Sequence, residues 1–299
     1  MSDERARILK LLEDGKITAD QAARLIEALG SRRHGFEFEL PVPPAPPRMH
    51  RRLAMKELDR IPDMVAHAVS KAVQSSFESG DERRVEFTGK RSLVVRTVSG
   101  DIEVAGQAGD ATSLQYTGGM ANVKEGDDSV DFRSTSSDVD ARVPAKSDVE
   151  VTTVSGDVKL SDVDGRVRVK TVSGDVDVAE HVGATEVATV SGDVELAGAL
   201  GELGVETRSG DVEVEAAGPV QGRVATKSGD ITLTLRADAD VMLEAEADEE
   251  GEVDLDIDAA HEVLEQRDNY AKVKFGAGSA SIVLRTRTGE ITVRSSKED

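Results

Sequence analysis

Residues 167–178 read Val-Arg-Val-Lys-Thr-Val-Ser-Gly-Asp-Val-Asp-Val, and this stretch decides the fold. Valine alternates with polar and charged residues on both sides of a central Ser-Gly-Asp, and a period of two is typical of β-strands with one buried face. Glycine allows backbone conformations that are costly for a residue with a Cβ, while Ser and Asp satisfy loose backbone groups at turns. The stretch therefore predicts two strands that meet at a sharp corner.

The same phrase recurs along the chain. From Gly156 to Gly229 its central glycines follow one another at intervals of 18, 18, 18 and 19 residues. Between Gly100 and Gly156, we interpret Thr117-Gly118-Gly119 and Ser136-Ser137-Asp138 as degenerate copies. The glycines that we predict to be structural turns are Gly100, Gly156, Gly174, Gly192, Gly210, Gly229 and Gly289.

A supersecondary unit repeated at a short, fixed period is typical of a solenoid, in which each rung lies on the next. Neighbouring rungs about 4.8 Å apart would place equivalent valines above one another and hydrogen-bond each backbone to its neighbours. We therefore expect a mainly β protein, a single-stack β-solenoid (β-helix) of two-strand rungs of about 18 residues. In an unbroken register, roughly a dozen rungs would fill residues 85–299.

Composition and charge narrow the function. Aromatic residues are only 3% of the chain and Trp is absent, which favours thin stacked layers over one thick core. The absence of Cys excludes disulfides, thiolate metal sites and a Cys nucleophile. Residues 1–84 hold 14 acidic and 15 basic side chains, whereas residues 85–299 hold 44 acidic and 22 basic. The repeat region should repel nucleic acid and attract cations or basic partners.

The sequence divides into four segments, three that precede the repeat and the repeat domain itself. Residues 1–30 show two short apolar stripes around Gly15, which predict a helical hairpin, and residues 31–47 form a Pro-rich linker. Residues 48–80 predict an amphipathic helix, and residues 85–299 are the acidic solenoid domain. Because two such short helices bury little apolar surface, self-association of the hairpin is the simplest hypothesis.

The basic start of the predicted helix has two interpretations. In the favoured interpretation, the helix is a cap that covers the first rung of the solenoid, since the open end of a solenoid must be covered. Alternatively, it attaches weakly to an anionic membrane surface through four lipid-facing residues, Arg48, Arg51, Arg52 and Lys56. The start of the chain lacks a secretory signal pattern and no apolar run is long enough to span a membrane, which favours a cytoplasmic location, with the inner membrane face as the alternative.

The repeated phrase of the type Thr-Val-Ser-Gly-Asp-Val-Glu-Val resembles the bacterial β-strand-repeat "putative adhesin" family of unknown function, over about residues 85–299. Residues 4–10, Glu-Arg-Ala-Arg-Ile-Leu-Lys, and 15–22, Gly-Lys-Ile-Thr-Ala-Asp-Gln-Ala, resemble the short helical module at the front of many such proteins. The resemblance implies a solenoid fold and a role near cell-envelope stress responses.

The Asp of each corner recurs with the repeat, so these carboxylates should form a column about 5 Å apart. Each Asp could cap its own turn, which we favour, or the column could hold Ca²⁺ or another hard cation. The residues of this candidate cation column are Asp157, Asp175, Asp193, Asp211 and Asp230. We propose no other metal site, because the five histidines share no ligand spacing and each is expected at the surface.

Nothing in the sequence favours catalysis. A catalytic residue would stand out as unique, whereas the Ser-Gly-Asp triplets repeat, and no phosphate loop or dinucleotide motif is present. We expect no cofactor and no enzymatic activity. The leading hypothesis is a self-associating or partner-binding scaffold or sensor linked to the cell-envelope stress response. The alternatives are a Ca²⁺-dependent adhesin-like binding module and a peripheral membrane-binding protein that attaches through residues 48–77.

Overall fold

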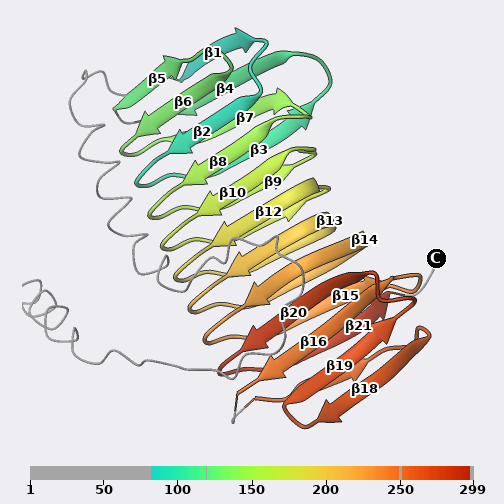
Figure 1. Ribbon diagram of the computed structural model, residues 1–299. Helices are drawn as coiled ribbons and strands as arrows, with labels where there is room; N and C mark the ends of the chain where they lie inside the picture. Colours follow the sequence, from blue (N-terminus) through green and yellow to red (C-terminus); the bar gives the residue numbers. More distant parts are fainter. Residues whose placement is uncertain (1–81, 119, 249–250, 297–299) are drawn as a thin grey trace, which may run out of the picture. The chain divides into compact units, whose positions relative to one another are not determined.

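The computed structural model describes residues 82–118, 120–248 and 251–296, which form a tall stack of β-strands (Figure 1). All 21 strands of this part belong to one hydrogen-bonded sheet. The mainly β fold is therefore confirmed. The predicted helical hairpin of residues 1–30, the linker of residues 31–47 and the helix of residues 48–80 lie outside the described residues.

Each rung places one strand in each of two walls whose inner faces form the core. In spatial order, the first wall contains β6 (Ser129–Ser134), β2 (Ser92–Arg96), β8 (Asp148–Thr152), β10 (Arg166–Lys170), β12 (Val182–Ala188), the second halves of β13 (Val194–Glu206) and β14 (Val212–Ala225), β20 (Ala280–Thr286) and β16 (Val241–Ala247). Neighbours in this wall are parallel. The second wall contains β7 (Asp138–Pro144), β3 (Ile102–Gln107), β9 (Val158–Ser161), β11 (Val176–Ala179), the first halves of β13 and β14, β15 (Ile231–Arg236), β21 (Ile291–Ser296) and β17 (Val253–Asp256).

The predicted valine column is confirmed. Val176 has Val158 and Val194 as its partners on the two neighbouring strands, and Val194 in turn has Val212. All four side chains are at most 1% exposed. Burial of these stacked valines removes apolar surface from water at roughly 25 cal/mol per Å², so the column is a main source of stability.

The rungs are fewer than expected, and their order in space differs from their order in the chain. Isolated bridges join eight corner residues in the series Ser136, Ser99, Ser155, Ser173, Ser191, Ser209, Ser228 and Thr288. One further rung, β16 and β17, follows β20 and β21. The prediction of a dozen rungs in an unbroken register is therefore wrong.

Two insertions explain the difference. Thr117 does not lie at a corner but ends β4 (Ala111–Thr117), which pairs antiparallel with β7 and with β1 (Arg83–Thr88). β5 (Ala121–Glu125) pairs antiparallel with β6. At the other end, β19 (Tyr270–Phe275) extends the first wall antiparallel to β16, and β18 (His261–Arg267) pairs antiparallel with β19. These segments lengthen the walls without forming rungs.

The first and the last rung of the chain are both tucked inside the stack. β2 lies between β6 and β8, and β20 lies between β14 and β16. The first and last strands of a chain are the ones that fray most readily, and a strand that is hydrogen-bonded on both sides is protected from fraying. The outermost rungs, β6 with β7 and β16 with β17, therefore come from inner segments of the chain.

The corners inside the stack need glycine for two reasons. Gly192 has a φ of 129°, a region that residues with a Cβ rarely adopt. A Cβ built on Gly192 would lie 2.2 Å from the carbonyl oxygen of Gly174, and a Cβ on Gly174 would lie 2.2 Å from the carbonyl oxygen of Gly156. Each corner glycine thus lets the neighbouring rung come close enough to pair.

We predict that Gly192→Ala destabilises the protein by about 3 kcal/mol or more, because strained φ and overlap with the Gly174 carbonyl add. Gly89→Ala is the matched control, since Gly89 also has a positive φ of 73° but a Cβ there would meet nothing within 4 Å. The control should lose only about 1–2 kcal/mol. Urea unfolding of the two variants measures the difference, and equal losses would show that close packing at the corner is unimportant.

Candidate functional site

The corner aspartates form a continuous hydrogen-bonded column. The backbone N–H of Asp193 donates to Oδ1 of Asp175 at 2.9 Å, and the N–H of Asp211 donates to Oδ1 of Asp193 at 2.8 Å. The same bond recurs at every corner in the series Asp138, Asp101, Asp157, Asp175, Asp193, Asp211, Asp230 and Glu290, with distances between 2.7 and 3.1 Å. Each carboxylate therefore satisfies a backbone donor at the corner of the next rung.

This geometry corrects the expectation that each Asp caps its own turn. Asp193 accepts from Asp211, a residue 18 positions later in the chain, so the bond joins two rungs. Bonds of a backbone N–H to a carboxylate are charge-assisted, which offsets the repulsion between stacked aspartates. The column is thus a structural element that links rungs along its whole length.

Among the described residues, no group of three or more His, Asp or Glu is arranged to hold a metal ion. The interpretation of Asp157, Asp175, Asp193, Asp211 and Asp230 as a Ca²⁺ column stays a prediction.

We predict that Asp193→Ala costs about 1 kcal/mol, because the N–H of Asp211 loses its acceptor. Asp193→Asn should fold with nearly wild-type stability, because its side-chain carbonyl can accept the same bond and carries no charge to repel Asp175 and Asp211. Thermal unfolding of both variants, in Ca²⁺ and in chelator, measures these effects. If Asn destabilises as much as Ala, and does so only in Ca²⁺, the carboxylate charge serves a cation instead.

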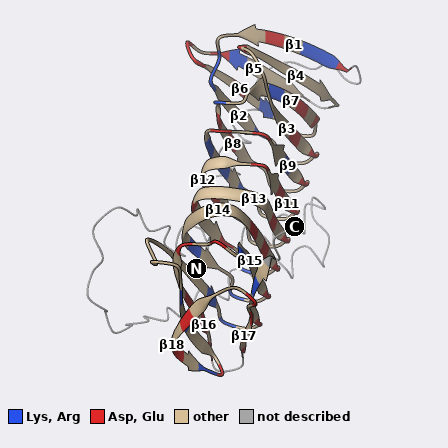
Figure 2. Ribbon diagram, turned by 90° about the vertical axis from the view of Figure 1, so that its right-hand side faces the viewer, with Lys and Arg blue, Asp and Glu red and all other residues tan. Residues whose placement is uncertain are grey.

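The outer face of the second wall carries a second acidic row beside the column. The row runs across neighbouring strands through Glu103, Lys159, Asp177, Glu195 and Glu213. Lys159 is the one basic residue among these five. In Figure 2, acidic segments recur down the edge that carries β3, β9 and β11. We call the corner column and this row together the acidic edge. Near β4, a hollow of about 430 Å³ opens on it, lined by residues that include Asp101, Glu103, Asp138, Asp140 and Asp157.

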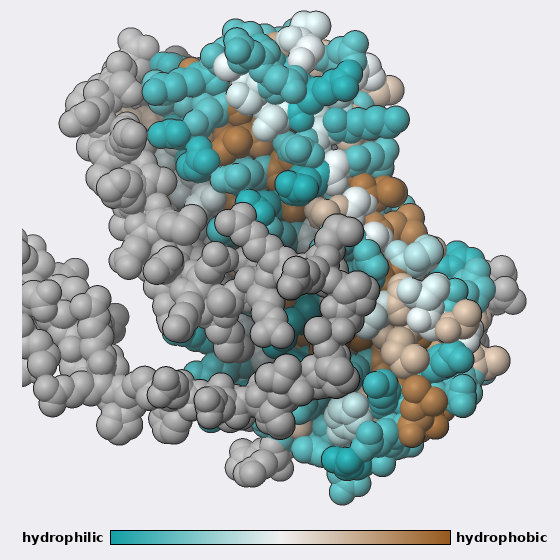
Figure 3. All heavy atoms as spheres, in the orientation of Figure 1, coloured by the Kyte–Doolittle hydropathy of each residue, from teal (hydrophilic) through white to brown (hydrophobic). Residues whose placement is uncertain are grey.

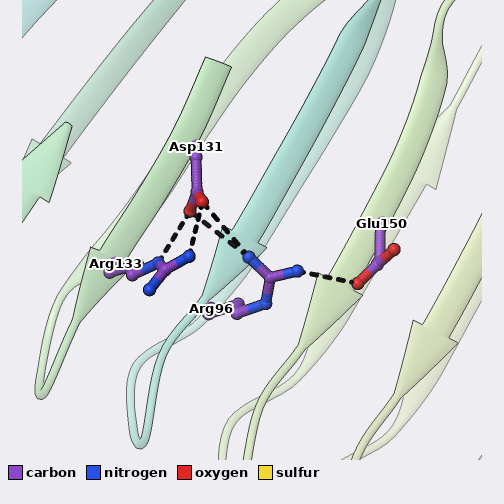
Figure 4. Close-up of polar contacts among 4 residues, drawn as sticks. All are labelled: Arg96, Asp131, Arg133 and Glu150. Carbon is purple, nitrogen blue, oxygen red and sulfur yellow. Dashed lines mark hydrogen bonds and ion pairs between the residues drawn. The ribbon is translucent and has the colours of Figure 1, made fainter. Parts of the chain in front are cut away.

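The outer face of the first wall has a different arrangement of charge. Arg96 on β2 bridges Asp131 on β6 at 3.3 Å and Glu150 on β8 at 3.1 Å, and Asp131 also pairs with Arg133 (Figure 4). Further along the wall, Arg168 pairs with Glu186 across strands. Opposite charges on adjacent strands neutralise each other, so the first wall presents charges of both signs, whereas the acidic edge is predominantly negative. Figure 3 shows that hydrophilic residues cover most of the described surface in this view, with hydrophobic residues between them.

One histidine that was expected at the surface is buried. His181 is 2% exposed and stands in an inner column with Val163 and Ala199, which precede and follow it by 18 residues. Its Nδ1 is bonded to the carbonyl oxygen of Val163, and its Nε2 is buried without a partner. The repeat itself was the signal that could have placed it, because 163 and 199 are apolar positions. His261 is exposed, and the other three histidines lie outside the described residues.

We predict that stability falls below about pH 6.5 because of His181. Burial lowers the pKa of His181 below its ordinary value of 6.5, although the Val163 carbonyl and Asp164 oppose this effect. As pH falls, the unfolded chain therefore takes up a proton that the folded chain resists, and up to about 1.4 kcal/mol per pH unit is lost. His181→Val, which repeats the neighbouring residue Val163, should flatten this dependence. Denaturant unfolding between pH 5 and pH 7.5 measures it, and an equally steep loss in the variant would exclude His181 as the cause.

With this geometry described, the chain can be compared with known families. Its sequence matches the family described as Toastrack DUF4097 over residues 63–181 and again over residues 122–294. The chain belongs to the Toastrack DUF4097 family. The two overlapping matches fit a repeat, since a Toastrack sequence can be aligned in more than one register. Residues 3–34 match the SHOCT-like domain, and no curated protein matches the chain.

Three solved structures resemble the Toastrack body. They are a "putative cell adhesion protein" from Clostridium sporogenes (10% identity, 73% of this chain and 100% of that chain, TM-score 0.30), a "putative adhesin" from Bacteroides fragilis (14%, 72% and 97%, 0.40) and a "putative adhesin" from Parabacteroides distasonis (13%, 73% and 98%, 0.25). The predicted resemblance to a β-strand-repeat family of unknown function is confirmed by the match to the Toastrack DUF4097 family. We draw nothing more from these three structures.

Several predicted residues cannot be placed. Arg48, Arg51, Arg52 and Lys56 lie outside the described residues, so the membrane hypothesis stays a prediction. In the described part of the Toastrack chain, no helix is long and apolar enough to cross a membrane.

The predicted turn glycines all have a positive φ, from 111° to 144°. They are Gly100, Gly156, Gly174, Gly192, Gly210, Gly229 and Gly289.

Proposed function

We propose that this protein is a non-enzymatic scaffold that binds basic partners along its acidic edge. The observation that carries the proposal is the contrast between the two walls. The first wall pairs its charges across strands, whereas the outer row of the second wall presents Glu103, Asp177, Glu195 and Glu213 beside the aspartate column.

The scaffold is rigid because its elements are joined twice. Parallel strand pairing links every rung to the next, and the aspartate column adds a bond at each corner. A rigid surface binds without losing much conformational entropy, so its charges act together on a partner. Complementary charge raises the association rate and selects partners by sign. The resemblance to an adhesin-like family supports an interaction role, and the proposal includes the implied link to the cell-envelope stress response.

A Lys-rich peptide labelled with a fluorophore tests the proposal by fluorescence anisotropy. We predict that Glu195→Lys with Glu213→Lys weakens binding about tenfold, because two favourable charges become repulsive. The matched control is Glu150→Lys with Glu186→Lys on the first wall, which changes the net charge by the same amount and should alter binding much less. Binding should also weaken as salt is added.

Equal weakening by both pairs of substitutions would mean that the peptide responds only to net charge. In that case the acidic edge would not be a partner surface, and the proposal would fail.

A further inference from the structure

The end of the stack that carries β1 and β5 presents apolar side chains that are incompletely buried. Val85 and Phe87 on β1 and Val123 on β5 pack against the core but are only half-buried. Their partners on the next strand inwards are fully buried. Val85 pairs with Leu114 and Val123 pairs with Phe132, and both of these partners are 0% exposed. The core is therefore complete as far as β4 and β6 and incompletely covered beyond them.

These half-buried side chains belong to both walls. β1 follows β4 at the end of the second wall, and β5 follows β6 at the end of the first wall. Figure 1 shows both strands at the same end of the stack. Paired residues point to the same side of a sheet, so Val85, Phe87, Ala121 and Val123 point inwards like the buried residues with which they pair. We call these four residues the apolar end.

The chain enters the described structure at the apolar end. Its first described residue, Glu82, directly precedes β1. A segment that ends at Phe77 is joined to β1 by residues 78–81, which span at most about 17 Å when extended. The preceding chain is therefore tethered close to the apolar end.

The other end of the stack is out of reach of this tether. It also has half-buried apolar side chains, Leu255 and Ile257. The second wall, however, runs from β1 through β4, β7, β3, β9, β11, β13, β14, β15 and β21 to β17. Ten strand spacings of about 4.8 Å place β17 roughly 48 Å from β1. The tether thus selects one of the two ends.

The sequence of residues 63–77 predicts an amphipathic helix. On a helical projection its apolar residues fall on one side, whereas His67, Ser70, Lys71 and Gln74 fall on the opposite side. The residues of this apolar stripe are Met64, Val65, Ala68, Val69, Ala72, Val73 and Phe77. A helix of this length is marginal alone and gains its stability by packing its stripe against another apolar surface.

Two observations select this segment as the occupant of the apolar end. The match to the Toastrack family begins at residue 63 and continues into the strands, whereas residues 3–34 match a different domain. The family model thus joins the segment to the strands. The short tether also gives the segment an effective concentration in the millimolar range, which a second copy at micromolar concentration cannot match.

We propose that residues 63–77 form a helix that lies across the apolar end, with its stripe on Val85, Phe87, Ala121 and Val123. The first rung of the chain, β2 with β3, has neighbouring rungs on both sides, so the cap expected from the sequence lies on β1 and β5 instead. A covered end cannot stack on another copy, and the docked stripe cannot insert into lipid. The proposal does not rest on binding by the acidic edge.

Hydrogen–deuterium exchange of the full chain, followed by mass spectrometry, tests the proposal. In the wild type, residues 64–77 should exchange slowly. Val69→Asp with Val73→Asp places two charges in the stripe, so exchange should become at least tenfold faster in residues 64–77 and also faster in β1 and β5. Ser70→Asp with Gln74→Asp is the matched control, since it adds the same charges on the polar side and should exchange as the wild type does.

Substitutions in the strands locate the contact. Phe87→Ser with Val123→Ser should speed exchange of residues 64–77 at least tenfold, although the segment itself is unchanged. Leu255→Ser with Ile257→Ser makes the same kind of change at the other end and should leave residues 64–77 protected. Circular dichroism verifies that the strands remain folded. The aspartate variants do not alter the strands, so they decide the test if a strand variant fails to fold.

Rapid exchange of residues 64–77 in the wild type would overturn the proposal, as would equal effects of the two strand variants. Protection that rises with protein concentration would assign the contact to a second copy. Protection that requires phosphatidylglycerol vesicles would assign the stripe to lipid, and either result would overturn the proposal. The peptide-binding experiment is independent, since Glu195 and Glu213 lie outside the apolar end.

Discussion

The close approach of one corner to the next is the contact on which the whole stack depends. The carbonyl oxygen of Gly174 occupies the space where a side chain of residue 192 would begin, and the carbonyl oxygen of Gly192 does the same for Gly210. The corner amides are satisfied at the same level by the aspartate carboxylates. The Gly and the Asp of the Ser-Gly-Asp motif therefore each make a contact between rungs. The conformation of a single turn explains only part of the preference for these residues.

The two ends of the stack support this explanation, because glycine is present only where a neighbouring rung presses against the corner. In the first rung in space, the glycine position is Ser137, and no earlier rung presses a carbonyl against it. At the other end, Gly251 of the last rung is still a glycine, and a Cβ built on it would lie 2.5 Å from the carbonyl oxygen of Gly289. Contacts between rungs explain why glycine is kept at Gly251 and is absent at Ser137, whereas a requirement of each turn alone would demand Gly at both.

Much of the fold could be predicted because residues one repeat apart in the sequence lie next to each other on neighbouring rungs. The alternation around Val167 and Val176 predicts two strands, and the 18-residue period predicts which valines pair. The order of the rungs could not be predicted, since the insertion of β2 between β6 and β8 depends on long-range pairing that no local pattern encodes. The segment around Thr117 has the residues of a corner, yet it ends an antiparallel strand because its neighbours belong to that insertion.

The candidate site was predictable in composition but not in arrangement. Acidic residues are plentiful in the repeat, but whether a carboxylate faces a cation depends on which residue lies one rung away. Glu150 and Glu195 look alike in the sequence, and only the register shows that Glu150 lies beside Arg96 while Glu195 lies between Asp177 and Glu213. His181 was misjudged for a related reason, because a polar residue at an apolar repeat position was interpreted from its type instead of its place in the period.

The sequence of the end strands is less constrained than that of the interior rungs. Inside, every corner must keep glycine and aspartate, so the sequence there can specify little besides the next rung. The end strands β1 and β17 lie outside the corner series, and in the described structure each pairs with only one other strand. Their side chains can therefore differ from the repeat at no cost to stacking. In a repeat protein built this way, specificity for a particular neighbour has room to reside where the repeat stops.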